Sequence, residues 1–169
     1  MGNLLGFQRL SVFWTISALA ALGWMALAVG LVAPARAQDQ VATLVIHVEG
    51  LSPKGGTLRL GLYDRASYPD DDSTPMASAD VKAEEGGNVI TLTNIAPGTY
   101  AIQTFQDINS NNKMDTNWFG FPLEPFGFSR DARPGFSKPR FADVKFNLAP
   151  GTNTQTVHLQ SFISLIAEK

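Results

Sequence analysis

Apolar side chains alternate with polar ones along most of the chain beyond residue 40, and this period of two restricts the fold more than any other feature. Every second side chain is apolar in residues 43–49, and residues 57–64 repeat the arrangement. The apolar positions are Leu44, Ile46, Val48, Leu58, Leu60 and Leu62. A strand with one apolar face buries that face against another layer. The pattern therefore predicts an all-β protein.

Further strands are expected wherever the alternation returns between turn residues. These segments are 77–83, 88–94, 99–106, 141–148 and 154–160. The first of them is weakly apolar and is expected at a sheet edge. A total of about seven strands is typical of a single antiparallel β-sandwich. The turn at 52–56 contains Gly55 and Gly56, so the first two strands are expected to form a hairpin.

The N-terminus has the organisation of a secretory signal peptide. Arg9 precedes an apolar run without charge over 10–33, and Ala35 and Ala37 supply small residues at a cleavage site. We expect cleavage after Ala37, which makes 1–37 the signal peptide, 38–160 the β-sandwich domain and 161–169 a tail that forms a short helix or an extra strand. The protein would then be exported, as a periplasmic or secreted domain. The alternative is an uncleaved membrane anchor, since the apolar run can cross about 30 Å of hydrocarbon.

Charge and cysteine content exclude several classes of function. Loss of Arg9 and Arg36 with the signal peptide adds to an acidic excess that is already present, with 13 basic and 15 acidic side chains in the full chain. Nucleic acid is therefore not an expected partner. The chain contains no cysteine, which excludes disulfides, a lipidated N-terminus and cysteine nucleophiles.

A long connection over 107–140 holds a candidate metal loop. Its oxygen-bearing side chains occupy relative positions 1, 3, 5 and 9 of a calcium-type loop, and position 7 offers a main-chain carbonyl. The expected ligands are Asp107, Asn109, Asn111, Lys113 through its carbonyl, Asp115 and a later carboxylate, Glu124. Trp118 stands at position 12, so the loop is not an EF-hand. The alternative is an Asx-turn loop satisfied by its own side chains and water.

Seven aromatic side chains follow this loop between residues 118 and 141. They are expected either to form a small separate core beneath the long connection or to present a platform for a peptide or carbohydrate ligand. The proposed ligand surface consists of Trp118, Phe121, Phe126, Phe128 and Arg130. The basic residues in this stretch would favour an anionic ligand or form a solvated rim; they are Arg130, Arg133, Lys138 and Arg140.

Two motifs in this region resemble a bacterial exported family called domain of unknown function 2141. The first runs from Pro97 to Asp115 and includes the candidate metal loop over 107–115, which we call the Asp/Asn loop. The second is the Gly-x-Pro-x-Glu-Pro-Phe-Gly-Phe-Ser stretch over 120–129. The resemblance covers about 41–159. It implies an immunoglobulin-like or prealbumin-like sandwich in the bacterial envelope and implies no activity. This sequence departs from the family pattern at Asn112, where glycine is usual, and at Arg130, where asparagine is usual.

The sequence favours a binding or structural role over catalysis. Both histidines, His47 and His158, fall inside predicted strands, where packing or exposure is commoner than proton transfer. The sequence therefore predicts an exported binding or structural module with a calcium-stabilised loop. The alternatives are a small envelope hydrolase that uses the carboxylates of Asp107, Asp115 and Glu124, and an accessory domain of a surface assembly.

Overall fold

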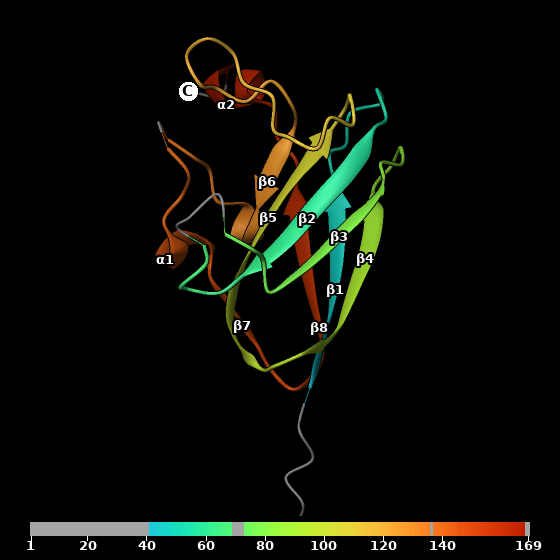
Figure 1. Cartoon of the computed structure of the whole chain (residues 1–169), viewed down its shortest axis with the longest axis vertical. Coiled ribbons are helices and arrows are strands. Elements are labelled where there is room, and N and C mark those ends of the chain that lie inside the picture. The colour runs from blue at the N-terminus through green and yellow to red at the C-terminus, as the bar shows by residue number, and fades with distance from the viewer. Residues whose placement is uncertain (1–40, 69–72, 136, 168–169) are drawn as a thin grey trace, which may run out of the picture. The chain divides into compact units, whose positions relative to one another are not determined.

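The computed structural model describes residues 41–68, 73–135 and 137–167 (Figure 1). The chain divides into two units, 1–37 and 38–169, and the predicted signal peptide lies outside the described residues. Within the described part, no helix has both the length and the apolar character needed to cross a membrane.

Eight strands and three short helical segments follow one another in the described part. The first strands are β1 (Ala42–Glu49), β2 (Thr57–Tyr63), β3 (Ala77–Lys82), β4 (Asn88–Ile95) and β5 (Gly98–Asp107). After the long connection come β6 (Phe126–Phe128), the 3-10 helix η1 (Ser129–Asp131), α1 (Phe141–Val144), β7 (Phe146–Leu148), β8 (Gly151–His158) and α2 (Phe162–Ala167). The described part of the chain is therefore mostly β, as the alternation predicted, with few helical residues.

The strands form two sheets. One has the order β4-β1-β8, and the other has the order β3-β2-β5-β6 with β7 paired to the far end of β5 (Figure 1). Every pair is antiparallel except β1 and β8, which run parallel from Ala42 opposite Gly151 to Glu49 opposite His158. The expectation of a purely antiparallel arrangement is therefore wrong for this pair.

The predicted hairpin between the first two strands is also wrong. β1 pairs with β4 and β8, whereas β2 pairs with β3 and β5, so the connection at 50–56 passes from one sheet to the other. The Gln106 side chain holds this connection by accepting a hydrogen bond from the Ser52 amide and donating to the carbonyls of Ser52 and Gly55. Glycine is required at 56, because a Cβ there would lie 2.3 Å from the Asp107 carbonyl oxygen.

The segment expected to be one strand at 141–148 is instead α1 followed by the three-residue β7. Phe141 and Val144 are both buried in the helical turn. The apolar pattern of this segment is therefore compatible with a helix as well as with a strand. The strand β6 was not expected, because three residues are too few to show a period. The tail forms α2, one of the two forms considered for it.

Side chains from both sheets meet in one hydrophobic core. Its fully buried members include Leu44, Ile46, Leu58, Leu62, Ile102 and Val157. A second cluster of Tyr68, Ala101, Phe141 and Val144 covers one end of the outer face of the sheet formed by β3, β2, β5 and β6. The rest of that outer face, which includes Arg59 and Phe105, lines the candidate site.

Candidate functional site

Strand register arranges the outer face of this sheet in rows. Since Leu58 and Leu60 point into the core, Arg59 and Gly61 point outward. Arg59 lies opposite Asp80 on β3 and Phe105 on β5, and Phe105 lies opposite Phe126 on β6. The next row toward the second cluster places Gly61 between Ser78 and Gln103, with Phe128 opposite Gln103. The rows thus run from charged and polar groups on β3 to aromatic groups on β6.

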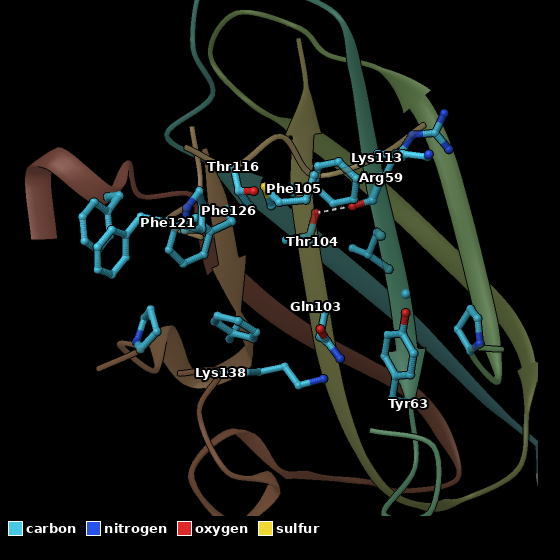
Figure 2. A pocket seen from close by; sticks show the side chains of 18 of the residues that line it. Arg59, Tyr63, Gln103, Thr104, Phe105, Lys113, Thr116, Phe121, Phe126 and Lys138 are labelled. Carbon is cyan, nitrogen blue, oxygen red and sulfur yellow. Dashed lines mark hydrogen bonds between the residues drawn. The ribbon is translucent and has the colours of Figure 1, made fainter. Parts of the chain in front are cut away.

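A cavity of about 750 Å³ lies over these rows (Figure 2). Its walls come from the Asp/Asn loop with Thr116 and Phe121, from the segment that carries Lys138, and from Phe162 on α2. Phe121 and Phe162 stack with their ring centres 4.2 Å apart, which joins the long connection to the C-terminal helix. We refer to this cavity as the groove. A volume in this range is typical of sites for small ligands.

Three of the five residues predicted for a ligand surface line the groove. They are Phe121, Phe126 and Phe128. Trp118 is 95% exposed and does not line the groove, and Arg130 lines a neighbouring cavity instead. Of the seven aromatic residues expected to form either a separate core or a ligand platform, Phe141 lies in the second cluster and Phe128 packs against it.

Sequence reasoning missed Tyr63 and Phe105, which also line the groove. Both residues point outward from their strands. The alternation predicts that they lie on the outer face of a sheet, but it does not predict that this face borders a cavity. Gly61 keeps the floor of the groove low, since a Cβ there would lie 2.5 Å from the Tyr63 ring. The pairing of a glycine with the aromatic ring beside it is a local signal that could have located the floor.

The Asp/Asn loop turns around the carboxylate of Asp107, which is fully buried. Its Oδ1 accepts a hydrogen bond from the Asn111 amide (3.0 Å), and its Oδ2 accepts from the Asn112 amide (2.8 Å) and from Arg59 Nε (2.9 Å). Burial alone would raise the pKa of Asp107, but the bonds from Arg59 and the two amides outweigh it and hold the pKa below its usual value. Asn112 has φ 69°, a left-handed conformation that glycine adopts readily and asparagine tolerates better than most residues.

Glu124 joins the two ends of the loop. Its carboxylate is 4% exposed and accepts hydrogen bonds from the Ile108 amide (2.8 Å) and the Asp115 amide (3.1 Å). Asp115 in turn accepts from the side-chain amides of Asn109 (2.7 Å) and Asn111 (3.0 Å). Hydrogen bonds therefore link Asp107, Asn109, Asn111, Asp115 and the distant Glu124 within one loop, partly through main-chain amides.

The hydrogen bonds of this loop determine how it would hold a cation. Asx turns are present, because the side chains of Asn109 and Asn111 accept from the amides two residues ahead. Among the described residues, no group of three acidic or histidine side chains converges in the way a metal site requires. Arg59 already supplies a positive charge to Asp107. A calcium ion would therefore have to draw on amide and carbonyl oxygens and compete with Arg59.

His158 belongs to an ion-pair cluster away from the groove. Its Nδ1 lies 2.9 Å from Asp131 Oδ2, and its Nε2 lies 3.3 Å from Glu49 Oε2. The hydrogen bond to Asp131, together with the charges of both carboxylates, raises the pKa of His158 above its ordinary value despite some desolvation. Asp131 and its neighbour Arg130 adopt left-handed backbone conformations, with φ of 50° and 63°.

This cluster predicts a pH dependence of stability. Because the pKa of His158 is raised by folding, its contribution is fully present below the unfolded value of about 6.5 and is lost as the pH rises through the folded value. Denaturant titrations from about pH 5.5 to 8.5 should show stability falling with pH in the parent and a flatter profile in His158→Gln. His47→Gln serves as a matched control and should keep the parent profile. An unchanged slope in His158→Gln would contradict the assignment.

Comparison with known proteins places the chain in a family without supplying an activity. No curated protein and no solved structure matches it. A family model does match, over residues 46–156, which include the inner strands, the Asp/Asn loop and most of the groove. The match covers more than half of the sequence and confirms the resemblance that the motifs indicated. The chain belongs to the bacterial family described as "Uncharacterized protein conserved in bacteria (DUF2141)".

Proposed function

We propose that this protein is an exported binding or structural module that holds a peptide or carbohydrate ligand of the bacterial envelope in the groove. The observation that carries this proposal is the convergence of Tyr63, Phe105, Phe121 and Phe128 around a cavity of about 750 Å³. Aromatic walls bind flat apolar groups, and the polar row of Ser78 and Gln103 supplies hydrogen bonds that orient a ligand.

We propose that the two sheets form a prealbumin-like β-sandwich. Tyr100, at the start of β5, donates a hydrogen bond from its hydroxyl to the Ala96 carbonyl (2.9 Å), a corner contact typical of β-sandwiches. The immunoglobulin arrangement keeps its first two strands in one sheet. Since β1 and β2 belong to different sheets here, the strand order favours the prealbumin-like alternative.

Export is proposed from the N-terminal sequence. Cleavage after Ala37 should give a protein that begins at Gln38, and intact-mass spectrometry of the envelope fraction measures this directly. Substitution of Ala37 by a bulky residue such as Ala37→Leu should block cleavage, since signal peptidase requires small residues there. Recovery of the parent as a full-length chain in the membrane fraction would support the anchored alternative.

A weakly bound calcium ion is proposed as a stabiliser of the Asp/Asn loop. The left-handed Asn112, the amides that converge on Asp107 and the bridge from Glu124 give the loop the compact form that such sites use. Competition from Arg59 and the absence of a carboxylate at position 12 both favour low affinity. We expect a dissociation constant of about 10⁻⁴ to 10⁻³ M, the range of extracellular modules.

Thermal melts test the calcium proposal. At tenfold excess of calcium over the dissociation constant, mass action adds roughly 1.4 kcal/mol and raises Tm by several degrees. Asp115→Ala should abolish the calcium shift, whereas Asp80→Ala, an acidic residue outside the loop, should retain it. Identical melts of the parent in calcium and in chelator would reject the metal and leave a loop closed by its own Asx turns.

A hydrolase is the second candidate, and the carboxylates give it less support. General acid catalysis needs a carboxyl group that holds a proton near neutral pH. Asp107 is instead ionised and paired with Arg59, and both oxygens of Glu124 accept main-chain hydrogen bonds. These contacts favour a structural role for Asp107 and Glu124, as residues that stabilise the loop.

Binding in the groove can be tested with an uncharged fluorescent probe, N-phenyl-1-naphthylamine. The purified protein should bind it. Phe121→Ala should weaken binding about tenfold, because the loss of apolar contact area with the phenyl ring lowers the binding free energy by about 1.4 kcal/mol. Trp118→Ala removes a larger aromatic side chain from the same connection but outside the groove, and it should leave the affinity unchanged. Equal effects of the two substitutions would reject the groove as the site. Displacement by peptide or glycan libraries then identifies the ligand class.

A further inference from the structure

The side-chain amide of Gln103 lies on the floor of the groove without a hydrogen-bond partner of its own. Figure 2 shows this side chain extending from β5, and it is half-buried there. Within the part of the chain that the structure describes, no group donates to its oxygen or accepts from its nitrogen. Glutamine carries an acceptor oxygen and a donor nitrogen side by side. The groove therefore contains a donor and an acceptor that a ligand can use together.

The positions around Gln103 on this face of the sheet are apolar. Along β5, the next outward residues are Ala101, which is buried in the second cluster, and Phe105. Across the neighbouring strands lie Gly61 on β2 and Phe128 on β6. None of these four side chains can form a strong hydrogen bond. A ligand that displaces water from the amide must therefore replace the lost hydrogen bonds, since an unsatisfied amide in an apolar setting weakens binding.

The polar groups in the adjoining row are already paired with one another. Arg59 donates hydrogen bonds to Asp107 (2.9 Å) and Asp80 (2.6 Å), and the Thr104 hydroxyl donates to the Arg59 carbonyl (2.8 Å). The main chain of β5 is paired with β2 on one side and with β6 on the other. Hydrogen bonds from the floor to a ligand are thus expected from Gln103.

An extended peptide matches the two groups of this amide. In an extended chain, the N–H and C=O of one residue point to the same side, as they do in a hydrogen-bonded pair of strands. A glutamine side chain can accept from that N–H and donate to that C=O at the same time. A sugar instead carries hydroxyl groups around its ring, and those that face Phe105 and Phe128 would lose water without a replacement. The apolar surroundings of Gln103 therefore favour a peptide over a carbohydrate.

We propose that the groove binds an extended peptide with an apolar side chain, and that Gln103 pairs with the N–H and C=O of one of its residues while the apolar side chain lies against Phe105 and Phe128. This inference rests on the proposed function and decides between the two ligand classes named there. The Gln103 amide sets the register of the peptide, and the aromatic walls supply apolar contact area.

An N-methylation scan of a short peptide tests the pairing in the parent protein. N-acetyl-Ala-Phe-Ala-amide should displace N-phenyl-1-naphthylamine from the groove. Methylation of one of its three residues, the one whose N–H bonds Gln103, should weaken displacement about tenfold, because the Gln103 oxygen then loses its donor. Methylation of either of the other two should change it less than about twofold.

Three results would contradict the inference. Equal effects of methylation at all three positions, or no displacement by the peptide, would overturn it. Displacement by the uncharged sugar tri-N-acetylchitotriose but not by the peptide would overturn it in favour of a carbohydrate and leave the proposed function standing. Failure of N-phenyl-1-naphthylamine to bind the parent would overturn both.

Paired glutamine variants locate the effect. Gln103→Leu keeps a side chain of similar size without the amide, so the three methylated peptides should become equivalent. Gln155→Leu makes the same change on β8, in the other sheet and outside the groove, and should keep the tenfold difference. Thermal melts show that both variants are folded. A position dependence that survives in Gln103→Leu, or that is lost in both variants, would overturn the assignment to Gln103.

Discussion

Arg59→Met is expected to lower the free energy of unfolding by about 3 kcal/mol, because it leaves the Asp107 carboxylate buried without its cation. Asp107 is fully buried, and Arg59 Nε approaches it at 2.9 Å. The amides of Asn111 and Asn112 still donate hydrogen bonds to the Asp107 carboxylate in the variant, but they carry no positive charge to balance it. Denaturant titration of the parent and the variant measures the difference.

The matched control removes the other ion pair of the same arginine. Arg59 also contacts Asp80 at 2.6 Å, but the Asp80 side chain is 53% exposed. Asp80→Asn should therefore cost less than about 1 kcal/mol. A small loss in both variants would mean that solvent reaches Asp107 and that the pair is not a buried one. If Arg59 competes with calcium, Arg59→Met should also increase the calcium-dependent shift in Tm.

Glu124→Ala is expected to destabilise the protein by about 2 to 4 kcal/mol. The substitution removes the acceptor of two main-chain amides, those of Ile108 and Asp115, and each unsatisfied partly buried donor costs about 1 to 3 kcal/mol. Since Glu124 fixes the connection that carries Phe121, the variant should also bind N-phenyl-1-naphthylamine more weakly.

Leu123→Ala provides the control for Glu124, because the neighbouring leucine is 63% exposed and its loss should change stability by less than about 0.5 kcal/mol. Thermal melts and dye titrations on the three proteins give both readouts. A Glu124→Ala protein with the stability and dye affinity of the parent would show that the loop closes without this bridge.

The strands could be predicted because burial follows the alternation closely. In β1 every second residue from Ala42 to Val48 is buried, as the sequence pattern requires. The pattern identifies the face that packs inward but carries no information about the sheet a strand joins, which is why β1 and β2 were assigned to one hairpin. The helical turn at 141–144 was missed for a related reason, since Phe141 and Val144 satisfy an i,i+3 spacing within a segment that also alternates.

The candidate site was predicted in part. Oxygen spacing identified the Asp/Asn loop, and the proline-flanked Glu124 was correctly expected to reach it. Arg59 was missed because it is 48 residues away from Asp107 and reaches it only through the pairing of β2 with β5. Trp118 was expected on the ligand surface beside Phe121, but its side chain is 95% exposed and does not line the groove, because position in the sequence does not determine toward which side of the connection a side chain points. Calcium binding and export remain predictions.

The parallel ladder between β1 and β8 affects how the chain can be made. A polypeptide emerges N-terminus first from the ribosome or from a translocation pore, so Ala42 is released long before its partner Gly151. Until then β1 has only β4 beside it, and the core lacks the inward side chain of Val157. Contacts so distant in sequence slow folding and delay it until the end of synthesis. The last strand must therefore be released before β1 has both of its neighbours, and a chain that ends before Gly151 leaves one edge of β1 open to proteases and to other chains.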